Sequence, residues 1–416
     1  MTPTLPDLTR AFGRIGLLSF GGPAAQIALM HREIVDDRQW VTEQEYLSAL
    51  SFCMLLPGPE AMQLATWIGW RKHGTLGGLI AGGLFVIPGA FVVLALSMIY
   101  AAWGELPVVA ALFTGVQAAV LAVVIEALLR VSKRALKLRI HWIIAIAAFC
   151  ALFLFGLPFP VIILAAGIWG YLTTPATDAI APVGPAPWRE SLRAAIIWGV
   201  IWLLPLAYLQ LLHPGILAEI ALFFSKLALL TFGGAYAVLT WMAQDVVQQK
   251  GWLTLPQMID GLGLAETTPG PLILVTEFVG YLAAFKQGGV WLGVAGALIT
   301  LWMTFTPCFL WIFAGAPWIA RLTAAPRLSG ALQAITAAVV GVIANLSLWF
   351  GLHVLFGKIS TVNAGPLHVL VPDLTSLNPL ATGLAIAAAY LLLRRHWPLP
   401  VVLGLCAITS AAVAAF

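Results

Sequence analysis

The chain has 416 residues, of which 61% are hydrophobic and only 9% are charged, and its mean hydropathy is +0.98. A soluble domain has about a quarter of its residues charged, so the composition excludes a water-soluble globular protein. The net charge of +4 is small and says little about partners, and nucleic acid is not expected because no basic stripe lies outside the apolar segments. Apolar runs of 17 to 25 residues recur along the chain, and each can cross about 30 Å of hydrocarbon as a helix. The predicted fold class is therefore an all-α polytopic membrane protein.

Helices are predicted in two sets of six, with ends uncertain by a few residues. The first set covers about 11–30, 43–72, 74–102, 107–129, 140–156 and 158–173. A Pro-rich linker, Thr173 to Pro187, and one extra helix at about 194–212 follow. The second set covers about 216–240, 255–286, 289–316, 328–356, 378–393 and 397–416. The expected organisation is a first unit over 1–173, a connecting segment over 174–212 and a second unit over 213–416, with about 13 transmembrane segments.

The two units are predicted to be copies of one ancestral unit. At an offset of 212 residues, Phe12 to Pro59 aligns without a gap on Phe224 to Pro271, with 15 identities in 48 columns. The shared positions include a Phe-Gly-Gly motif, a Trp and a Pro-Gly-Pro motif, which chance similarity of Leu-rich and Ala-rich segments does not produce. A single helix between two six-helix units reverses the second unit in the bilayer, so the sequence predicts inverted repeats.

The distribution of basic residues agrees with this inversion. With a cytoplasmic N-terminus and strict alternation of sides, 15 Lys and Arg residues fall in the cytoplasm and four on the other side. The alternation places Arg38 and Lys286 outside and Lys250 inside. A re-entrant hairpin at either Pro-Gly-Pro motif would change the number of crossings.

Both Pro-Gly-Pro motifs lie in the middle of apolar runs, where they are expected to break a helix near the bilayer midplane. A half-helix that begins after such a break exposes N–H groups and a positive dipole end, which favour an anion. We expect second breaks at the Phe-Gly-Gly motifs, with new helices from about Ala24 and Ala235. An alternative is that these Pro and Gly residues only kink and pack helices. The residues of the two breaks in each half are the first candidates for substrate binding: Gly21, Gly22, Pro57, Gly58, Pro59, Gly233, Gly234, Pro269, Gly270 and Pro271.

Ionisable and hydroxyl side chains near the breaks complete the candidate site. Arg14 and Lys226 occupy equivalent repeat positions and are expected either to pair with an anion or to extend toward the membrane surface. Glu60 and Glu266 are candidates for proton coupling, although Glu60 is also positioned to cap a half-helix; Glu126 and Glu277 are weaker candidates. The hydroxyls of Ser19, Thr231 and Thr268 can donate to an oxyanion or bond back to their own helices.

Signatures of enzymes and metal sites are not found in the sequence. The HExxH and GxSxG motifs and His/Cys clusters with ligand spacing are absent, and the four cysteines lie singly in apolar runs. The segment from Gly351 to Lys358 departs from a phosphate-binding loop in its spacing and in the residue after the Lys. We therefore expect no catalytic residues, no metal and no cofactor, and transport driven by an ion gradient or a counter-substrate. The N-terminal residues do not show the pattern of a cleaved signal peptide.

Several motifs resemble the chromate ion transporter family in its long, two-domain form. They are Phe20-Gly21-Gly22-Pro23-Ala24, Trp40-Val41 and Leu56-Pro57-Gly58-Pro59 in the first half, and Phe232-Gly233-Gly234, Trp252-Leu253 and Thr268-Pro269-Gly270-Pro271 in the second. The resemblance covers nearly the whole chain. It implies efflux of chromate from the bacterial cytoplasm, resistance to chromate, and sensitivity to sulfate. The second half departs from the first in replacing Pro23 with Ala235 and Glu60 with Leu272, which argues against two equal sites.

The leading hypothesis is thus a secondary-active exporter of chromate with one central site, located in the bacterial inner membrane. A carrier of sulfate or a related anion is the alternative within transport, and a membrane-embedded enzyme or scaffold is the alternative of another class. The expected partners are the oxyanion and the lipid bilayer, with a homodimer also compatible with the sequence and nucleic acid not expected.

Overall fold

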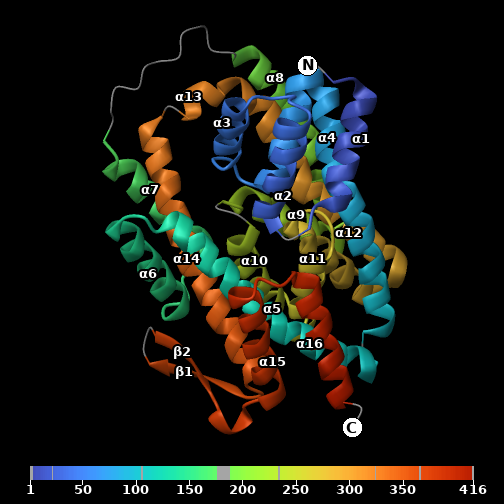
Figure 1. The fold of residues 1–416 in the computed structure, drawn as a ribbon, viewed down its shortest axis with the longest axis vertical. Coiled ribbons are helices and arrows are strands. Elements are labelled where there is room, and N and C mark those ends of the chain that lie inside the picture. Colours follow the sequence, from blue (N-terminus) through green and yellow to red (C-terminus); the bar gives the residue numbers. More distant parts are fainter. Residues whose placement is uncertain are drawn as a thin grey trace.

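A computed structural model describes residues 3–20, 22–104, 106–175, 188–232, 235–323, 325–364 and 367–414. Within these ranges the fold is helical except for one antiparallel hairpin of β1 (Ile359–Ala364) and β2 (Leu367–Pro372) (Figure 1). Five helical stretches are long and apolar enough to cross a membrane: Glu60–Trp103, Pro107–Ala135, Trp188–Leu212, Leu272–Trp318 and Pro326–Leu355. Four shorter apolar helices accompany them. An all-α, multi-pass membrane protein is therefore confirmed.

The first half begins with two interrupted helices. α1 (Leu5–Leu18) and α2 (Gly22–His31) are separated at the Phe-Gly-Gly motif, and a π-helical turn (Arg32–Asp37) extends α2. α3 (Glu43–Cys53) and α4 (Glu60–Trp103) are separated at the first Pro-Gly-Pro motif. The remaining helices are α5 (Pro107–Ala135), α6 (Arg139–Phe153), α7 (Phe159–Thr173) and the connecting α8 (Trp188–Leu212). Most of the predicted linker lies outside the described residues.

The elements of the second half follow in the same order. They are α9 (Ile216–Leu230), α10 (Ala235–Gln244), a π-helical turn (Asp245–Gln249), α11 (Leu255–Thr267), the 3-10 turn η3 (Leu272–Leu274), α12 (Val275–Gly315), η4 (Ala316–Trp318), α13 (Ile319–Thr323), α14 (Pro326–Leu355), η5 (Leu374–Ser376), α15 (Pro379–Ala389) with a π-helical extension (Tyr390–Arg394), and α16 (Leu399–Ala414). Among the described residues, the second half differs from this order by the 3-10 turns, the short helix α13, the β-hairpin and the π-helical extension of α15. The breaks expected at the two Pro-Gly-Pro motifs are present. The new helices expected from about Ala24 and Ala235 begin at Gly22 and at Ala235.

α4 and α12 each fold back on themselves at a glycine. The backbone leaves the helical conformation at His73 and Gly74 in α4 and at Gly288 and Gly289 in α12. Glycine allows the two arms of each helix to pack closely, since a Cβ added to Gly69 would lie 2.1 Å from the carbonyl oxygen of Gly77. Each long helix is thus a hairpin with one short and one long arm.

The interrupted segments return to the end of the molecule from which they start. Arg71, at the end of the short arm of α4, lies 3.5 Å from Glu45 at the start of α3. In the second half the Lys286 Nζ donates to the carbonyl oxygen of Trp252 at 2.8 Å. This differs from the strict alternation expected from the sequence, which placed Lys250 and Lys286 on opposite sides. Figure 1 accordingly shows α1, α2 and α3 together at the end of the molecule that carries the N-terminus.

α1 and α2 make the same return, and so do α9 and α10. Arg14 on α1 is paired with Glu33, in the turn that follows α2, at 3.6 Å. The pKa of Asp7, near the start of α1, is lowered mainly by hydrogen bonds from Thr4 and further by the charges of Arg10 and Arg38. In the second half Lys250 lies 3.9 Å from Glu219, near the start of α9. The two arms of each of these segments therefore lie side by side, with their ends close together.

Helices of each half pack on helices of the other half. α4 packs on α12, α5 packs on α15 and α16, and α14 packs on α6 and α7. Small residues permit the close approaches, as where Gly115 of α5 lies against the backbone of Cys406 and Gly341 of α14 lies against that of Ala145. Neither half buries its helices without the other.

Candidate functional site

The two Pro-Gly-Pro loops meet the Phe-Gly-Gly loops of the opposite half at the centre of the fold. The Gly58 N–H donates to the carbonyl oxygen of Thr231 at 2.7 Å, and the Gly270 N–H donates to that of Ser19 at 2.8 Å. Both pairs are related by the 212-residue offset. The structure thus joins the four breaks that the sequence picked out.

Backbone geometry explains why glycine stands between the two prolines. Gly58 has φ = +121° and Gly270 has φ = +94°, a region that strains other residues. Pro59 is the N-cap of α4, so Glu60 is its first residue. After the second motif the chain instead forms η3 before α12 begins at Val275. The loops are therefore similar but not identical.

Buried side chains hold each loop in place. The Gln63 amide nitrogen donates to the Pro57 carbonyl oxygen at 2.7 Å, and that of Gln26 donates to the Gly270 carbonyl oxygen at 2.7 Å. A Cβ added to Gly58 would lie 3.0 Å from the Cys308 sulfur, and one added to Gly89 would lie 2.2 Å from the Pro269 carbonyl oxygen. The long arm of α12 thus contacts the first loop, and the long arm of α4 contacts the second.

A cavity of about 480 Å³ opens beside the first loop. Gly58 and Glu60 line one wall with Pro23 and Ala24 of the first Phe-Gly-Gly-Pro motif. The lining also includes four basic residues: Arg130, Lys133 and Arg134 at the C-terminal end of α5, and Lys137 just after it. Cys53, Met54, Leu56, Thr336 and Ile343 complete much of the remaining lining.

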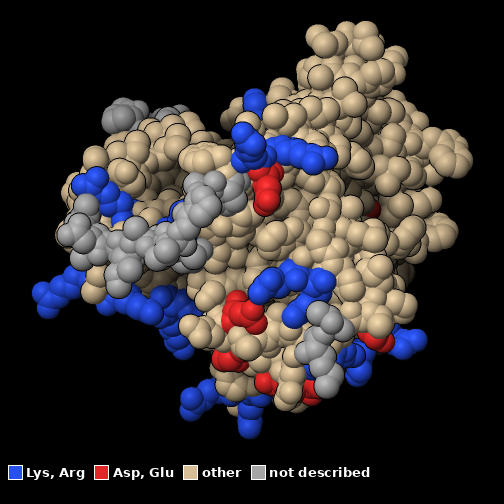
Figure 2. All heavy atoms as spheres, turned by 90° about the horizontal axis from the view of Figure 1, so that it is seen from above, with Lys and Arg blue, Asp and Glu red and all other residues tan. Residues whose placement is uncertain are grey.

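The charges around this cavity favour an anion. Arg134 and Glu60 line the same cavity, and the Glu126 carboxylate forms an ion pair with Arg130 one turn away. Lys133, Arg134 and Lys137 have no ion-pair partner within 4 Å among the residues that the structure describes. Seen from above, basic side chains gather along part of the surface, while a broad area carries none (Figure 2). The cavity therefore joins a helix break to a basic surface.

Glu266 lines a different, smaller cavity. This space of about 220 Å³ lies between α5 and the start of α16, with Glu126, Arg130, Glu266 and His396 among its lining residues. Arg130 and Ala127 line both cavities. The two proton-coupling candidates, Glu60 and Glu266, are thus on opposite sides of one turn of α5.

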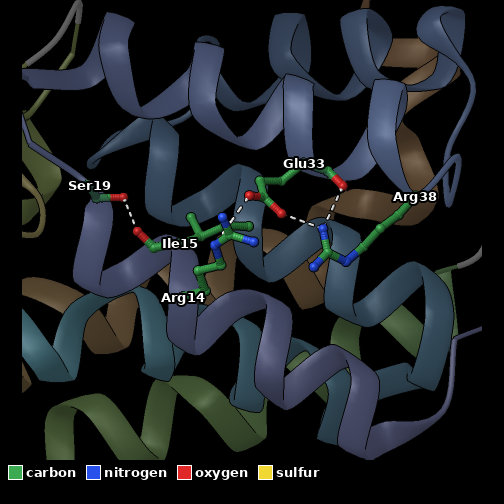
Figure 3. A network of polar contacts seen from close by, with 5 residues as sticks. All are labelled: Arg14, Ile15, Ser19, Glu33 and Arg38. Atoms are coloured by element: carbon green, nitrogen blue, oxygen red, sulfur yellow. Dashed lines mark hydrogen bonds and ion pairs between the residues drawn. The ribbon is translucent and has the colours of Figure 1, made fainter.

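Arg14 and Lys226 lie apart from the central cavity. Figure 3 shows Glu33 between Arg14 and Arg38, with Arg38 forming the closer ion pair. The Arg14 side chain is 62% exposed, whereas that of Glu33 is 4% exposed. Lys226 lines an outer cavity of about 410 Å³ with Asp245 and Lys250, which are the repeat equivalents of Glu33 and Arg38.

The predicted hydroxyl donors are engaged within their own helices. Ser19 Oγ donates to the Ile15 carbonyl oxygen at 2.7 Å (Figure 3), and Thr231 Oγ1 donates to that of Leu227 at 2.7 Å. Thr268 Oγ1 lies 3.3 Å from the Ala265 carbonyl oxygen. These hydroxyls therefore take the second of the two expected roles in this structure, and the backbone carbonyls of Ser19 and Thr231 make the contacts between halves. Gly21, Gly233 and Gly234 lie outside the described residues, Gly22 begins α2, and Pro271 is the N-cap of η3.

Sequence reasoning missed two groups of residues at this site. The basic residues from Arg130 to Lys137 enter the sequence prediction only through the charge asymmetry, although their position at the end of an apolar helix is a usable signal. Gln26 and Gln63 are absent from the predicted site. A carboxamide in a long apolar run is itself unusual, and each of these two buried amides holds one loop.

Comparison with known proteins decides the family. A family model described as chromate transporter matches residues 6–171 and 218–411. The chain belongs to the chromate transporter family. Relatives in this family include the chromate transport protein of Pseudomonas aeruginosa, 34% identical over 81% of this chain and 79% of that protein.

Other relatives in the chromate transporter family cover similar lengths. The chromate transport protein of Cupriavidus metallidurans is 30% identical over 82% of this chain and 81% of its own length. The probable chromate transport protein of Synechococcus elongatus is 29% identical over 89% of this chain and 92% of its own length. No solved structure matches the chain. The resemblance noted in the motifs is therefore confirmed, and the chain is a member of a transporter family with several apolar membrane helices.

Proposed function

We propose that this protein is a secondary-active transporter that exports chromate from the cytoplasm across the bacterial inner membrane and so confers chromate resistance. The observation that carries the proposal is the cavity beside the first Pro-Gly-Pro loop, where four basic side chains face a half-helix N-terminus. Membership in the chromate transporter family and relatives named as chromate transport proteins support the choice of substrate.

The proposed binding site is the wall formed by Gly58, Glu60 and the first turn of α4. The first N–H groups of this helix and its positive dipole end attract the oxyanion, and Arg134 and Lys133 supply balancing charge. Glu60 would repel a dianion when ionised and admit it when protonated, which supports its role in proton coupling. The second loop, at Pro269 to Pro271, serves as the counterpart that holds Ser19, and Glu266 borders the neighbouring cavity.

The proposed topology is a pair of inverted repeats with half-length hairpins. In this topology two hairpins in each half enter the membrane and return to the side from which they start. In the first half they are α1 with α2, and α3 with the short arm of α4. The other nine segments cross the bilayer. They are the long arms of α4 and α12 together with α5, α6, α7, α8, α14, α15 and α16. The first repeat then opens its hairpins to the cytoplasm and the second opens them to the opposite side.

This arrangement strengthens the charge asymmetry. With the N-terminus inside, it places in the cytoplasm all 21 Lys and Arg residues except Lys226, Lys250, Lys286 and Lys358. That distribution follows the positive-inside rule more closely than 13 alternating segments do. The basic mouth of the 480 Å³ cavity faces the cytoplasm in this topology, as an exporter that collects its substrate there requires.

The decisive test is transport into everted vesicles that contain the purified protein. Saturable uptake of labelled chromate that depends on an imposed proton gradient or membrane potential supports the proposal. Uptake of labelled sulfate without uptake of chromate would keep the transport mechanism and replace the substrate, because the two tetrahedral dianions are of similar size. Absence of flux with both anions would overturn the proposal.

A further inference from the structure

We infer that Glu277, on the second repeat's long helix, is a proton-binding site of the transport cycle. The inference rests on the proposed function for its role in transport, but the protonation of Glu277 can be tested without any substrate. Glu277 does not line the proposed oxyanion cavity.

Glu277 is a buried carboxyl without a hydrogen-bond partner. Its residue is 1% exposed, and both side-chain oxygens lack a hydrogen-bond partner among the residues that the structure describes. It makes no ion pair within 4 Å in those residues either. An isolated carboxylate in an apolar interior costs many kcal/mol, so the neutral acid is the form that this environment accepts.

Two other unpartnered polar groups belong to the same helix hairpin. Tyr281 follows Glu277 by one turn, so the two side chains share a helix face. The Tyr281 hydroxyl is buried and has no hydrogen-bond partner within the described part of the chain. On the facing arm, Thr300 lies against Gly280. Thr304, one turn further along, is therefore level with the first turn of α12, and its hydroxyl is also buried and unpartnered. These groups form a small polar region inside an otherwise apolar helix pair.

The other buried acid of this region has a different environment. Asp260 on α11 accepts hydrogen bonds from the Tyr100 hydroxyl at 2.6 Å and from the Gln117 amide at 2.8 Å. Two donors stabilise the ionised form of Asp260 in place. Glu277 has no such donors, so the two carboxyls are suited to different protonation states.

The position of Glu277 links it to the loop contacts at the centre of the fold. It lies in the first turn of α12, a few residues after the Pro269–Pro271 loop that is bonded to Ser19 of the first half. The dipole at this helix end favours the ionised form once water or a donor reaches the carboxyl. A shift of the loop can therefore change Glu277 from neutral to ionised, and this change releases one proton.

The charged and titratable neighbours on the packed elements do not neutralise Glu277. The long arm of α12 contributes Cys308, and α4, α8, α9 and α11 pack on α12. None of the ionisable side chains that these four helices carry is hydrogen-bonded to or ion-paired with Glu277 among the described residues. They are Glu60, Arg71, Lys72, His73 and Tyr100 of α4, Arg189, Glu190, Arg193 and Tyr208 of α8, Glu219 and Lys226 of α9, and Asp260 and Glu266 of α11. Tyr100 and Asp260 bond to each other, and Glu219 pairs with Lys250. α4, the equivalent helix of the first repeat, carries no acidic residue after Glu60, so the site is specific to the second repeat.

Infrared spectroscopy of the purified protein near neutral pH tests the protonation directly. Protonated carboxyl groups give a carbonyl-stretch absorption that carboxylates lack. We expect this absorption to decrease in Glu277→Gln, to persist at a shifted position in Glu277→Asp, and to remain unchanged in the control Asp260→Asn. An identical absorption in the wild type and in Glu277→Gln would overturn the inference, whether or not the protein transports chromate.

Transport provides the second readout. In proteoliposomes, Glu277→Gln should lose the stimulation of chromate flux by a proton gradient, and Glu277→Asp should restore part of it. A full response to the gradient in Glu277→Gln shows that the coupling proton binds elsewhere. If the wild type carries no chromate, the proposed function fails, while the infrared result still decides whether Glu277 holds a proton.

Discussion

The Gly58 N–H is hydrogen-bonded to the Thr231 carbonyl oxygen at 2.7 Å, so the first Pro-Gly-Pro loop is closed by a residue from the other half of the chain. The reciprocal bond, from Gly270 to Ser19, is 2.8 Å long. Each Pro-Gly-Pro loop is thus held by a residue of the other half of the chain. A rearrangement of the first loop that frees Gly58 has to break its bond to Thr231.

Membrane-impermeant thiol labelling of intact cells distinguishes nine crossings from 13. In a cysteine-free background, Asp37→Cys should be protected and Gln249→Cys should be labelled, because the hairpins place these exposed positions inside and outside respectively. The two positions are repeat equivalents, and 13 alternating segments predict the opposite pattern. Labelling of both after permeabilisation is the control for reactivity.

Removal of one cavity charge should weaken transport. We expect Arg134→Gln to raise the chromate concentration for half-maximal uptake about tenfold, the effect of losing one charge-assisted interaction. Arg139→Gln is the matched control, because Arg139 belongs to the same basic cluster but does not line the cavity. Equal effects of the two substitutions, measured at the same ionic strength, would show that only general surface charge matters.

Close packing of α4 on the second loop should be sensitive to a single methyl group. In Gly89→Ala the new Cβ would lie 2.2 Å from the Pro269 carbonyl oxygen, so we expect a loss of about 1–3 kcal/mol in stability. The measurement is the thermal unfolding midpoint in detergent, together with chromate flux. Gly83→Ala on the same helix has its nearest neighbour at 3.7 Å and should be neutral or slightly stabilising.

The ion pairs around Glu33 predict unequal effects of two arginines. Arg38→Ala removes the closer partner of a buried carboxylate and should destabilise the protein by about 3 kcal/mol. Arg14→Ala removes an exposed and more distant partner, and we expect a loss below about 1 kcal/mol. Unfolding midpoints of both variants test this order. If Arg14→Ala lowers chromate export strongly while its unfolding midpoint stays close to that of the wild type, Arg14 takes part in substrate binding.

His31 should make stability depend on pH. The hydrogen bond to Glu43, at 2.5 Å, raises the pKa of His31, and the charge of Asp36 acts in the same direction. A raised pKa in the folded state stabilises the protein fully below the ordinary pKa of histidine, and this contribution is lost as pH rises through the folded value. The difference in unfolding midpoint between the wild type and His31→Gln should therefore be larger at about pH 6 than at about pH 9. Glu43→Gln should remove most of this pH dependence, and a difference that does not vary with pH would contradict the assignment.

Local features were predictable from the sequence because they follow from residue type. Proline and glycine placed the breaks at 57–59 and 269–271, and apolar length placed most helices within a few residues. α1 and α8 begin six residues earlier than expected, and α13 and the β-hairpin were not predicted. The return of each broken helix was not predictable, since hydropathy is the same for a crossing helix and for a hairpin of equal length. The pairing of Glu45 with Arg71 and of Trp252 with Lys286 shows the return, and it is a tertiary contact.

The candidate site was predictable only in part, for a similar reason. Glycine-rich breaks identified the loops, but the partner of each loop lies about 170 to 250 residues away in sequence, beyond any local pattern. Arg14 and Lys226 are cations near a break in sequence, but in the structure Arg14 pairs with Glu33 and Lys226 lines an outer cavity with Asp245. The basic end of α5 reaches the first loop only through the tertiary fold.

The reciprocal bonds between the loops also bear on how such a fold can be assembled from shorter chains. A chain that ended after α7 would hold Gly58 without Thr231 and Ser19 without Gly270, and its α5 would lack the surface provided by α15 and α16. We therefore expect a half-length polypeptide of this design to be unstable alone. It would require a second half-length polypeptide, inserted in the opposite orientation, to complete both loops.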